Sequence, residues 1–482
     1  MTESWIVEET RTVDLNDARL NARFREVLAQ LGERPTASIP AACGGHAEMT
    51  AAYRLFDNAK ATFERILAPH TEATRQRMAA QPIVLLVQDT TEIDVTRPAQ
   101  QVQGAGPLDQ GTRRGMLLHE QHAFTPEGTP LGTVTGVLWA REEGAVCAPL
   151  LRAQRAAIPI ENKESYRWVQ TLCKAREEAA RCPSTQVISV SDSEADIYEV
   201  LSEAQAEPHR IDWIVRGCQD RALQREAGET AARHIYEAVL GQPVLFSQTL
   251  RVRGRDPKVA CETRGRRQPR RSRQAQVDLR SARVCLRPPW RPDGKLPAIE
   301  VNVVLVREVG APGDDEPIEW LLLTSLPVGN AEQAREVIQY YCVRWMIEIF
   351  FRVLKSGCRV EQRRFEHLDR LQACLAVYLI VAGRTLYVCR LGRACPDINC
   401  EALFEPAEWK SVWKILLGSD PPPKPPPLGQ MTIMVAQLGG YVPRKGTHPG
   451  PQTIWIGLQR THDFALCWKT FGPEGKTRPQ DV

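Results

Sequence analysis

Two aspartates stand at places in the chain where a carboxylate can do chemistry. Asp89 and Asp192 each close a short run rich in Val, Ile and Leu, which predicts that both side chains project from strand ends. A buried, isolated aspartate is energetically costly, so a carboxylate at such a position usually caps a turn or faces a cation. For either aspartate alone, capping a turn is the simpler interpretation.

A third carboxylate, Glu348, lies in the segment YYCVRWMIEIFFRVLKSG, within a long helix predicted over residues 330–356. At about 100° per residue, four polar residues of this helix fall within an arc of roughly 60°. They are Tyr341, Arg344, Glu348 and Lys355. The apolar residues on the opposite side are Val343, Ile347, Phe350 and Leu354. A solvated charged face would also use Arg, Glu and Lys, but it does not explain a tyrosine on the same stripe.

These motifs resemble those of the DDE transposases of bacterial insertion sequences, of the transposon-five type within the insertion-sequence-four family. The four polar helix residues match its signature Y-x2-R-x3-E-x6-K. The segment DSEAD at residues 192–196 is similar to the second-carboxylate motif DREAD, with Ser193 in place of the arginine, and QDTTEID at residues 88–94 is similar to the first. KESYRW (163–168) and EWLLLTS (319–325) also match, whereas Arg352 replaces a lysine.

The resemblance implies metal-assisted phosphoryl transfer on DNA, in which transposon ends are cleaved through a hairpin and then joined to target DNA. The catalytic residues would be Asp89, Asp192 and Glu348, which would hold two Mg²⁺ ions because hard cations prefer carboxylate oxygen. Mn²⁺ is expected to substitute for Mg²⁺. Without a cation, three crowded carboxylates would raise one another's pKa values.

The resemblance also implies DNA contacts. Tyr341, Arg344 and Lys355 would hold DNA phosphate, with Arg acting as a bidentate fork and Lys as a point charge. Trp320, in EWLLLTS, matches the position that stacks on a base flipped out of the duplex, which needs an aromatic platform. The alternative for Trp320 is a core tryptophan in an apolar strand.

Local clustering of arginine supplies a separate indication of DNA binding. Six arginines without an intervening acid lie close together, and such a run is either a solvated segment or a phosphate contact. They are Arg264, Arg266, Arg267, Arg270, Arg271 and Arg273. Arg216, after a predicted strand, and Arg113 with Arg114 are further candidates.

The order of elements predicts a mixed α/β fold. After a helical N-terminal region, a strand, a hairpin, a helix, a strand, a helix and a strand follow, which is the outline of the ribonuclease H fold. We expect a helical domain at residues 1–68 that binds transposon-end DNA. A ribonuclease H-like catalytic domain is expected at 69–375, with a β-rich, helix-free insertion at about 218–328, and a helical dimerisation domain at 376–482 that contains the proline run 421–427.

Composition sets the wider frame. The 482 residues carry 62 Lys and Arg against 58 Asp and Glu, so a nucleic-acid site must come from local clustering rather than from the net charge of +4. The 14 scattered cysteines predict reduced thiols. The best apolar run, residues 371–383, falls short of the roughly 20 residues of a membrane span. We therefore expect a bacterial cytoplasmic protein, without a membrane partner, that joins the nucleoid when bound to DNA.

Two other functions remain open from the sequence. One is a domesticated protein that binds transposon ends without cutting them, against which the intact carboxylate triad argues. The other is a different ribonuclease H-like nuclease, such as a resolvase, which would lack the Y-R-E-K helix. For the transposase, the expected partners are double-stranded DNA, at transposon ends and at the target, and a second copy of the chain in a synaptic homodimer.

Overall fold

The chain begins with a bundle of short helices, as predicted. The computed structural model describes residues 5–97, 101–109, 111–144, 157–206, 211–225, 232–252, 272–291, 294, 296–311, 313, 317–444 and 446–473. The side chains of Asp17, Ser38 and Thr62 accept backbone N–H groups at helix starts, which satisfies donors that a helix leaves free. The helices are α1 (Trp5–Glu9), α2 (Ala18–Glu33), α3 (Ile39–Cys43), α4 (His46–Phe56) and α5 (Phe63–Ala79).

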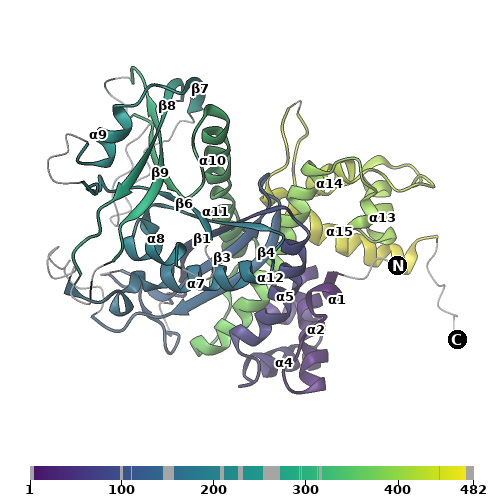
Figure 1. Ribbon diagram of the computed structural model, residues 1–482. Helices are drawn as coiled ribbons and strands as arrows, with labels where there is room; N and C mark the ends of the chain where they lie inside the picture. The colour runs from purple at the N-terminus through teal and green to yellow at the C-terminus, as the bar shows by residue number, and fades with distance from the viewer. Residues whose placement is uncertain are drawn as a thin grey trace, which may run out of the picture.

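A large mixed sheet forms the centre of the molecule (Figure 1). Its strands lie in the order β2-β3-β1-β5-β6-β10-β9-β8-β7, with β4 paired to β3. Among the described strands, β1, β5 and β6 are mutually parallel and the other neighbours are antiparallel. The bounds are β1 (Ile83–Asp94), β2 (Gly106–Pro107), β3 (Arg114–Phe124), β4 (Pro130–Trp139), β5 (Gln186–Ser191), β6 (Asp212–Arg216), β7 (Phe246–Val252), β8 (Arg273–Leu286), β9 (Ile299–Glu308) and β10 (Glu319–Thr324).

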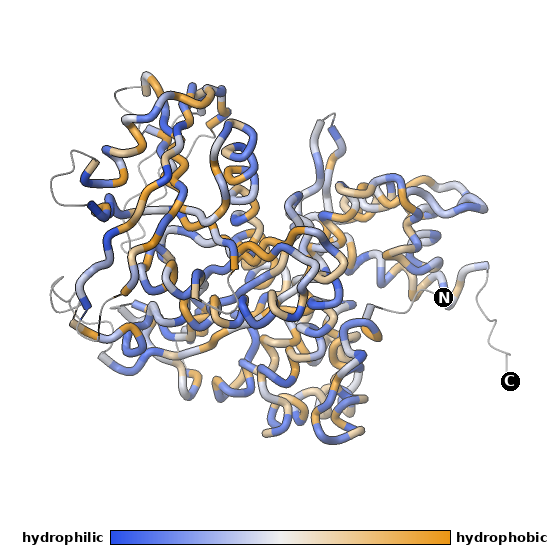
Figure 2. The backbone as a smooth tube through the Cα atoms, viewed as in Figure 1, coloured by the Kyte–Doolittle hydropathy of each residue, from blue (hydrophilic) through white to orange (hydrophobic). Residues whose placement is uncertain are grey.

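Helices cover both faces of this sheet, and the two cores alternate along each strand. In β1, Leu85 and Val87 belong to one core and Val84 and Leu86 to the other, as the period of two in a strand requires. Figure 2 shows the hydrophobic residues concentrated where the helices meet the sheet. One layer contains α7 (Arg167–Ala180), α8 (Tyr198–Ala204) and α9 (Ile235–Leu240); the other contains α10 (Ala331–Val343), α11 (Trp345–Arg352), α12 (Leu368–Ala394) and the N-terminal helices. Single 3₁₀ turns occur at Ile160–Asn162, Glu164–Tyr166, Ser193–Ala195, Val360–Gln362 and Cys400–Ala402.

The β-rich segment 218–328 continues the central sheet. Strand β10 pairs antiparallel with β6, and β9, β8 and β7 follow outward from it. The expectation that this segment is helix-free is wrong, because it contains α9. In α9, Ile235 and Val239 are fully buried one turn apart, and a helix of six residues is too short to give a clear periodic signal.

The long helix predicted over 330–356 is interrupted twice. It breaks at Arg344, which ends α10 and precedes α11, and Val353–Gly357 forms a π-helical turn. The apolar face is confirmed, since Ile347, Phe350 and Leu354 are fully buried. The uniform rotation of 100° per residue does not hold along the whole segment, because a π-helical turn has more residues per turn than an α-helix.

The C-terminal region is helical, as predicted, and forms a lobe beside the sheet (Figure 1). It contains α13 (Pro406–Leu417), α14 (Leu428–Leu438) and α15 (Pro451–Phe471), with the proline run between α13 and α14. The expected boundary at 375/376 falls inside α12, and that at 68/69 falls inside α5. Both helices run without a break, so a cut at either place would divide a helix.

Helix α12 is longer than the apolar run 371–383 that we judged too short for a membrane span. By length and composition its 27 residues could cross a membrane. However, 83% of its apolar window is buried inside the structure, between β4, α5 and the C-terminal helices. This burial is typical of a core helix, whose stability comes from apolar area removed from water.

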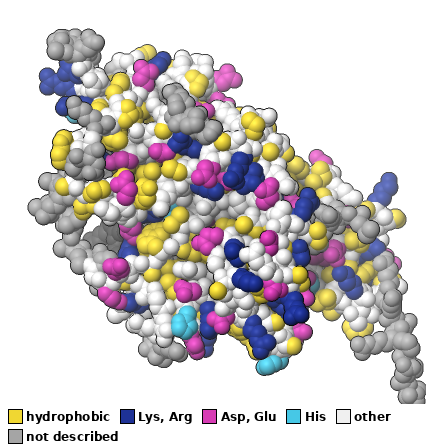
Figure 3. Space-filling model, turned by 60° about the horizontal axis from the view of Figure 1, so that its bottom comes forward, with side chains coloured by type: hydrophobic (Ala, Val, Ile, Leu, Met, Phe, Trp, Pro, Cys, Tyr) yellow, Lys and Arg dark blue, Asp and Glu magenta, His cyan; other side chains and the backbone are white. Residues whose placement is uncertain are grey.

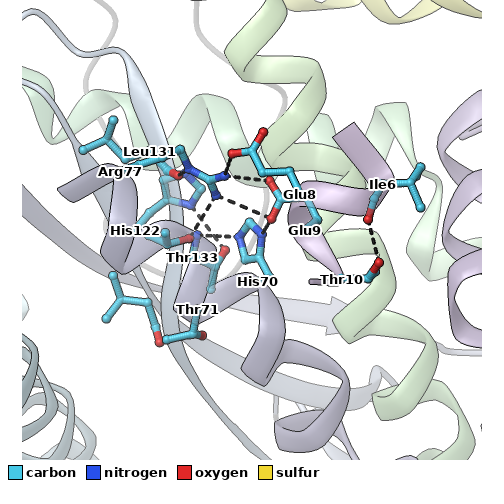
Figure 4. Close-up of polar contacts among 12 residues, drawn as sticks. Ile6, Glu8, Glu9, Thr10, His70, Thr71, Arg77, His122, Leu131 and Thr133 are labelled. Carbon is cyan, nitrogen blue, oxygen red and sulfur yellow. Dashed lines mark hydrogen bonds and ion pairs between the residues drawn. The ribbon is translucent and has the colours of Figure 1, made fainter. Parts of the chain in front are cut away.

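A buried polar network holds α1 against α5 and β4 (Figure 4). Nε2 of His70 accepts the N–H of Thr133 at 3.0 Å, so the ring carries its proton on Nδ1, which lies 2.5 Å from Oε2 of Glu9. Burial alone would raise the pKa of Glu9, but His70 and Arg77 lower it to about 2. The first helix is therefore fixed to α5 and β4 by charge-assisted hydrogen bonds.

Candidate active site

The register between β1 and β5 sets the two aspartates side by side. Gln88 pairs with Ser191 at the end of this parallel ladder, and Asp89 and Asp192 are the residues that come next in the chain. Neighbouring strands lie about 4.8 Å apart, so the two carboxylates lie close together where β5 ends. We call this place, at the carboxyl end of β5 and beside Asp89 in β1, the site edge of the sheet. The sequence alone does not give this register, because it depends on which strands become neighbours.

Asp89 does not end its strand, contrary to the sequence prediction. Strand β1 continues to Asp94, because β3 pairs with it antiparallel and places Glu120 opposite Asp89. Asp192 does follow the last residue of β5, and its carboxylate accepts the N–H of Glu194 at 2.8 Å. Asp89 similarly accepts the N–H of Thr90 at 2.7 Å. Both aspartates therefore make the local backbone bonds of the simpler interpretation, and the charge of Asp192 also acts on Asp89.

This proximity carries an electrostatic cost. Burial, together with the negative charge of Asp192, raises the pKa of Asp89 to about 7. Its backbone hydrogen bond and Arg344 oppose the rise without cancelling it. A carboxyl group in this state gains from any nearby cation that favours its ionised form.

Arg344 bridges two of the three predicted catalytic carboxylates. Its Nη1 lies 3.3 Å from Oδ2 of Asp89, and its Nη2 donates to Oε1 of Glu348 at 2.6 Å. The arginine is 5% exposed and its guanidinium lies over the ring of Trp345, whereas the side chain of Glu348 is 42% exposed. In the described ranges, no three Asp, Glu, His or Cys side chains form a ready-made metal-binding group. A side-chain cation thus occupies the position between Asp89 and Glu348.

Three further predicted residues meet at the same edge. Tyr341 is buried, and the ring of Trp320 meets it edge-on at 5.9 Å between centroids. Burial raises the pKa of Tyr341, while Arg344 and Arg216 act in the opposite direction. Arg216 pairs with Leu322 in the next strand, two residues from Trp320, which is half-buried. The structure therefore brings Arg216, Trp320 and Tyr341 together.

Other predicted DNA contacts lie elsewhere or have protein partners. Lys355 lies in the π-helical turn, 3.5 Å from Glu361. Arg273 begins β8 and makes two hydrogen bonds with Glu308, at 2.9 and 2.7 Å, so here it has a structural role. The remaining arginines of the cluster lie outside the described residues; they are Arg264, Arg266, Arg267, Arg270 and Arg271.

The surface charges are mixed. Figure 3 shows basic and acidic side chains interspersed over one face. The weaker candidate Arg113 pairs with Glu92 at 3.0 Å and Asp94 at 2.9 Å, and Arg114 pairs with Glu143. These pairs reduce the basic charge that the two arginines can offer to DNA.

Two residues next to the site were given no role by sequence reasoning. Arg167, from the KESYRW segment, donates to Oγ1 of Thr90 at 3.0 Å and to Glu194 at 3.2 Å. Asp196, the last residue of DSEAD, is buried against Arg221. Both residues belong to matched motifs, and this is the feature of the sequence that could have identified them. Their partners, Thr90 and Arg221, are distant in the sequence and could not be predicted from it.

His119 and His122, three residues apart in β3, lie on opposite faces of the strand. His119 meets Trp168 of α7 with 4.5 Å between ring centroids, and His122 lies 4.6 Å from the ring of Phe350 of α11. They cannot share one ion in this arrangement.

Three family models match the chain. One described as "Transposase DNA-binding" matches residues 2–61, "Transposase DDE domain" matches 199–382, and "Transposase Tn5 dimerisation domain" matches 380–469. The second match contains Trp320 and Glu348, while Asp89 and Asp192 precede it. Among solved structures, the chain is similar to the piggyBac transposase synaptic complex with hairpin DNA, at 10% identity and TM-score 0.33. That match covers 69% of this chain and 52% of the other, about half its length.

We expect Asp89→Asn to stabilise the metal-free protein at pH 8 by about 1–3 kcal/mol, seen as a higher melting temperature in EDTA. Because the pKa of Asp89 is raised in the folded state, to about 7, its ionisation opposes folding. This penalty grows as pH rises from about 4 and is complete above about 7. Near pH 3 the variant and the wild type should melt alike.

The matched control is Asp94→Asn in the same strand. Burial acts to raise the pKa of Asp94, but hydrogen bonds from Thr96 and Arg113 lower it overall. That change should therefore destabilise the protein at pH 8. An Asp89→Asn protein that melts below the wild type at pH 8 would contradict the electrostatic description of the site.

Proposed function

The chain is a Tn5-type DDE transposase, and on that premise we propose that it performs cut-and-paste DNA transposition by divalent-metal-dependent strand cleavage and strand transfer at transposon ends. The observation that carries this proposal is the parallel register that sets Asp89 beside Asp192. Glu348 joins them through Arg344, from a helix packed on the same edge.

The catalytic core proposed for this reaction is ribonuclease H-like. Three parallel strands, β1, β5 and β6, flanked by the antiparallel strand β3 and covered by helices on both faces, support this assignment. Strands β7–β10 would then be the β-rich insertion, which brings Trp320 to the site.

The donor set suits Mg²⁺, with Mn²⁺ as a substitute. Asp89, Asp192 and Glu348 offer only carboxylate oxygens, which are the ligands these hard cations prefer. The pKa of Asp89 is raised even though Arg344 lies between Asp89 and Glu348. This supports the proposal that the carboxylates would be stabilised by a further positive charge. When bound, a pair of such ions would supply activation of the attacking hydroxyl and stabilisation of the leaving oxygen.

The residues around the carboxylates would hold and orient DNA. Arg216 and Tyr341 offer a cation and a hydroxyl beside the aspartates, and Trp320 offers an aromatic face for a base extruded during hairpin formation. Arg344 would contact phosphate through N–H groups that its bonds to Asp89 and Glu348 leave free, because each terminal nitrogen carries two hydrogens. Lys355, farther along the same helical segment, would contact a phosphate of the DNA strand. The arginines from Arg264 to Arg271 remain a proposed phosphate contact.

We also propose a synaptic homodimer on two double-stranded DNA ends, which then captures target DNA. The N-terminal match to a DNA-binding domain and the C-terminal match to a dimerisation domain support this arrangement. In it, the N-terminal helices would recognise the end sequence and the C-terminal helices would join the two copies.

Glu348→Ala should abolish Mg²⁺-dependent nicking of a duplex carrying the element's terminal inverted repeat, while binding of that duplex stays intact. The carboxylate lies at the proposed site and its side chain is 42% exposed, so its removal should leave the fold unchanged. Gel shift and strand-specific cleavage measure the two properties. Glu336→Ala, on the preceding helix, is the control and should cut normally.

Loss of both binding and nicking would make Glu348 a structural residue. Wild-type protein that shifts the duplex and leaves it intact with Mg²⁺ would overturn the enzyme assignment. The chain would then be a non-cleaving transposon-end-binding protein.

Trp320→Ala should slow hairpin formation at least tenfold more than it slows first-strand nicking. An extruded base costs a few kcal/mol, and stacking on the indole ring would offset this cost. Trp290→Ala, which removes a tryptophan that is 72% exposed on a loop, is the control. Equal slowing of both steps in Trp320→Ala would count against a stacking role.

A further inference from the structure

Asp196 is a buried carboxylate that the proposed reaction does not use. Its side chain is 0% exposed, and Oδ2 accepts the N–H groups of Cys218 at 2.8 Å and Gln219 at 3.0 Å. Its Oδ1 accepts Nε of Arg221 at 2.9 Å and Nη2 at 2.5 Å. One side chain thus fastens the segment 218–221, which follows β6, to the turn that follows β5.

That turn begins at the second catalytic aspartate. The N–H of Ala195 donates to the carbonyl of Asp192 at 3.2 Å, and the N–H of Asp196 donates to that of Ser193 at 3.3 Å. Asp192 and Asp196 are therefore the two ends of one short hydrogen-bonded turn. A shift at Asp196 would be transmitted to Asp192 through the three residues of the turn between them.

The other side of the clamp leads to the DNA-contacting residues. Arg216 lies two residues before Cys218, and between them the N–H of Gly217 donates to the carbonyl of Leu321 in β10 at 2.7 Å. A second connection comes from Asp220, which accepts the N–H of Tyr236 at 3.0 Å. The hydroxyl of Tyr236 then donates at 2.7 Å to Glu319, the residue before Trp320.

A buried ion pair is a weak source of net stability, because desolvation offsets much of the attraction between the charges. What this pair does supply is fixed geometry, since a planar guanidinium and a carboxylate meet in one preferred orientation. Here the geometry being fixed is that of Asp192 relative to Arg216 and β10.

We propose that Asp196, with Arg221, is a positioning residue that sets the Asp192 carboxylate against the Arg216–Trp320 side of the site. This inference rests on the proposed function. Its expected consequence is the effect typical of groups that orient metal-ligating carboxylates, a 10–100-fold loss in metal affinity or activity on substitution.

The test compares two buried ion pairs in the full-length protein. Asp196→Asn removes the clamp. Glu178→Gln removes a similar pair, in which a glutamate 1% exposed binds Arg75 at 2.5 and 3.2 Å. Glu178 lies eleven residues along α7 from Arg167, about 16 Å from the site end of that helix. Both variants should lose thermal stability to a similar degree.

The two variants should differ in two other measurements. In metal-free protein, hydrogen–deuterium exchange should rise at residues 193–197 and at 218–219 in Asp196→Asn and stay unchanged there in Glu178→Gln. On the terminal-repeat duplex, Asp196→Asn should need 10–100-fold more Mg²⁺ for half-maximal nicking, while Glu178→Gln should match the wild type. Arg221→Lys, which keeps the charge and the two backbone bonds to Asp196, should give a smaller change in the same direction. It replaces Asp196→Asn in the comparison if that protein does not fold.

Wild-type Mg²⁺ dependence and exchange in the clamp variant would overturn the positioning role. So would losses in Asp196→Asn and Glu178→Gln that follow stability alone. Absence of Mg²⁺-dependent nicking by the wild type would instead overturn the proposed function, a separate result.

Discussion

The parallel pairing of β1 with β5 brings Asp89 and Asp192 to neighbouring positions in the sheet. Burial of Asp89, together with the like charge of Asp192, raises the pKa of Asp89, so the ionised carboxylate opposes folding. Neighbouring groups partly offset this electrostatic cost. Arg344 supplies a positive charge between Asp89 and Glu348, and backbone N–H groups satisfy one oxygen of each aspartate. A site that is unfavourable without a cation is suited to bind one.

The rest of the chain holds this edge in place. The outer strands β7–β10 extend the sheet on the β6 side and carry Trp320 toward Tyr341. On the other face, α12 buries its apolar surface against β4 and α5 and continues toward the C-terminal helices. The parts that match DNA-binding and dimerisation models are thus attached to the same rigid sheet as the carboxylates. Through this attachment, DNA binding by the N-terminal helices and dimerisation by the C-terminal helices would affect the geometry of the site.

Local patterns predicted much of this structure. The composition of the runs before Asp89 and Asp192 predicts strands, and the period of the apolar residues predicts the buried face of the helix that carries Glu348. Features set by distant partners were not predicted. Strand β1 runs past Asp89 because β3 pairs with it, and α9 forms because Ile235 and Val239 are covered by distant strands. The double contact of Arg344 and the clamp at Asp196 likewise depend on residues far away in sequence.

We propose that Asp89 and Asp192 together bind a divalent cation, and anomalous diffraction would locate that ion. Crystals of the full chain with a terminal-repeat duplex and Mn²⁺ should show a manganese peak bounded by these two carboxylates. A well-ordered complex with DNA in the site and no manganese beside these carboxylates would show that they do not form a cation site.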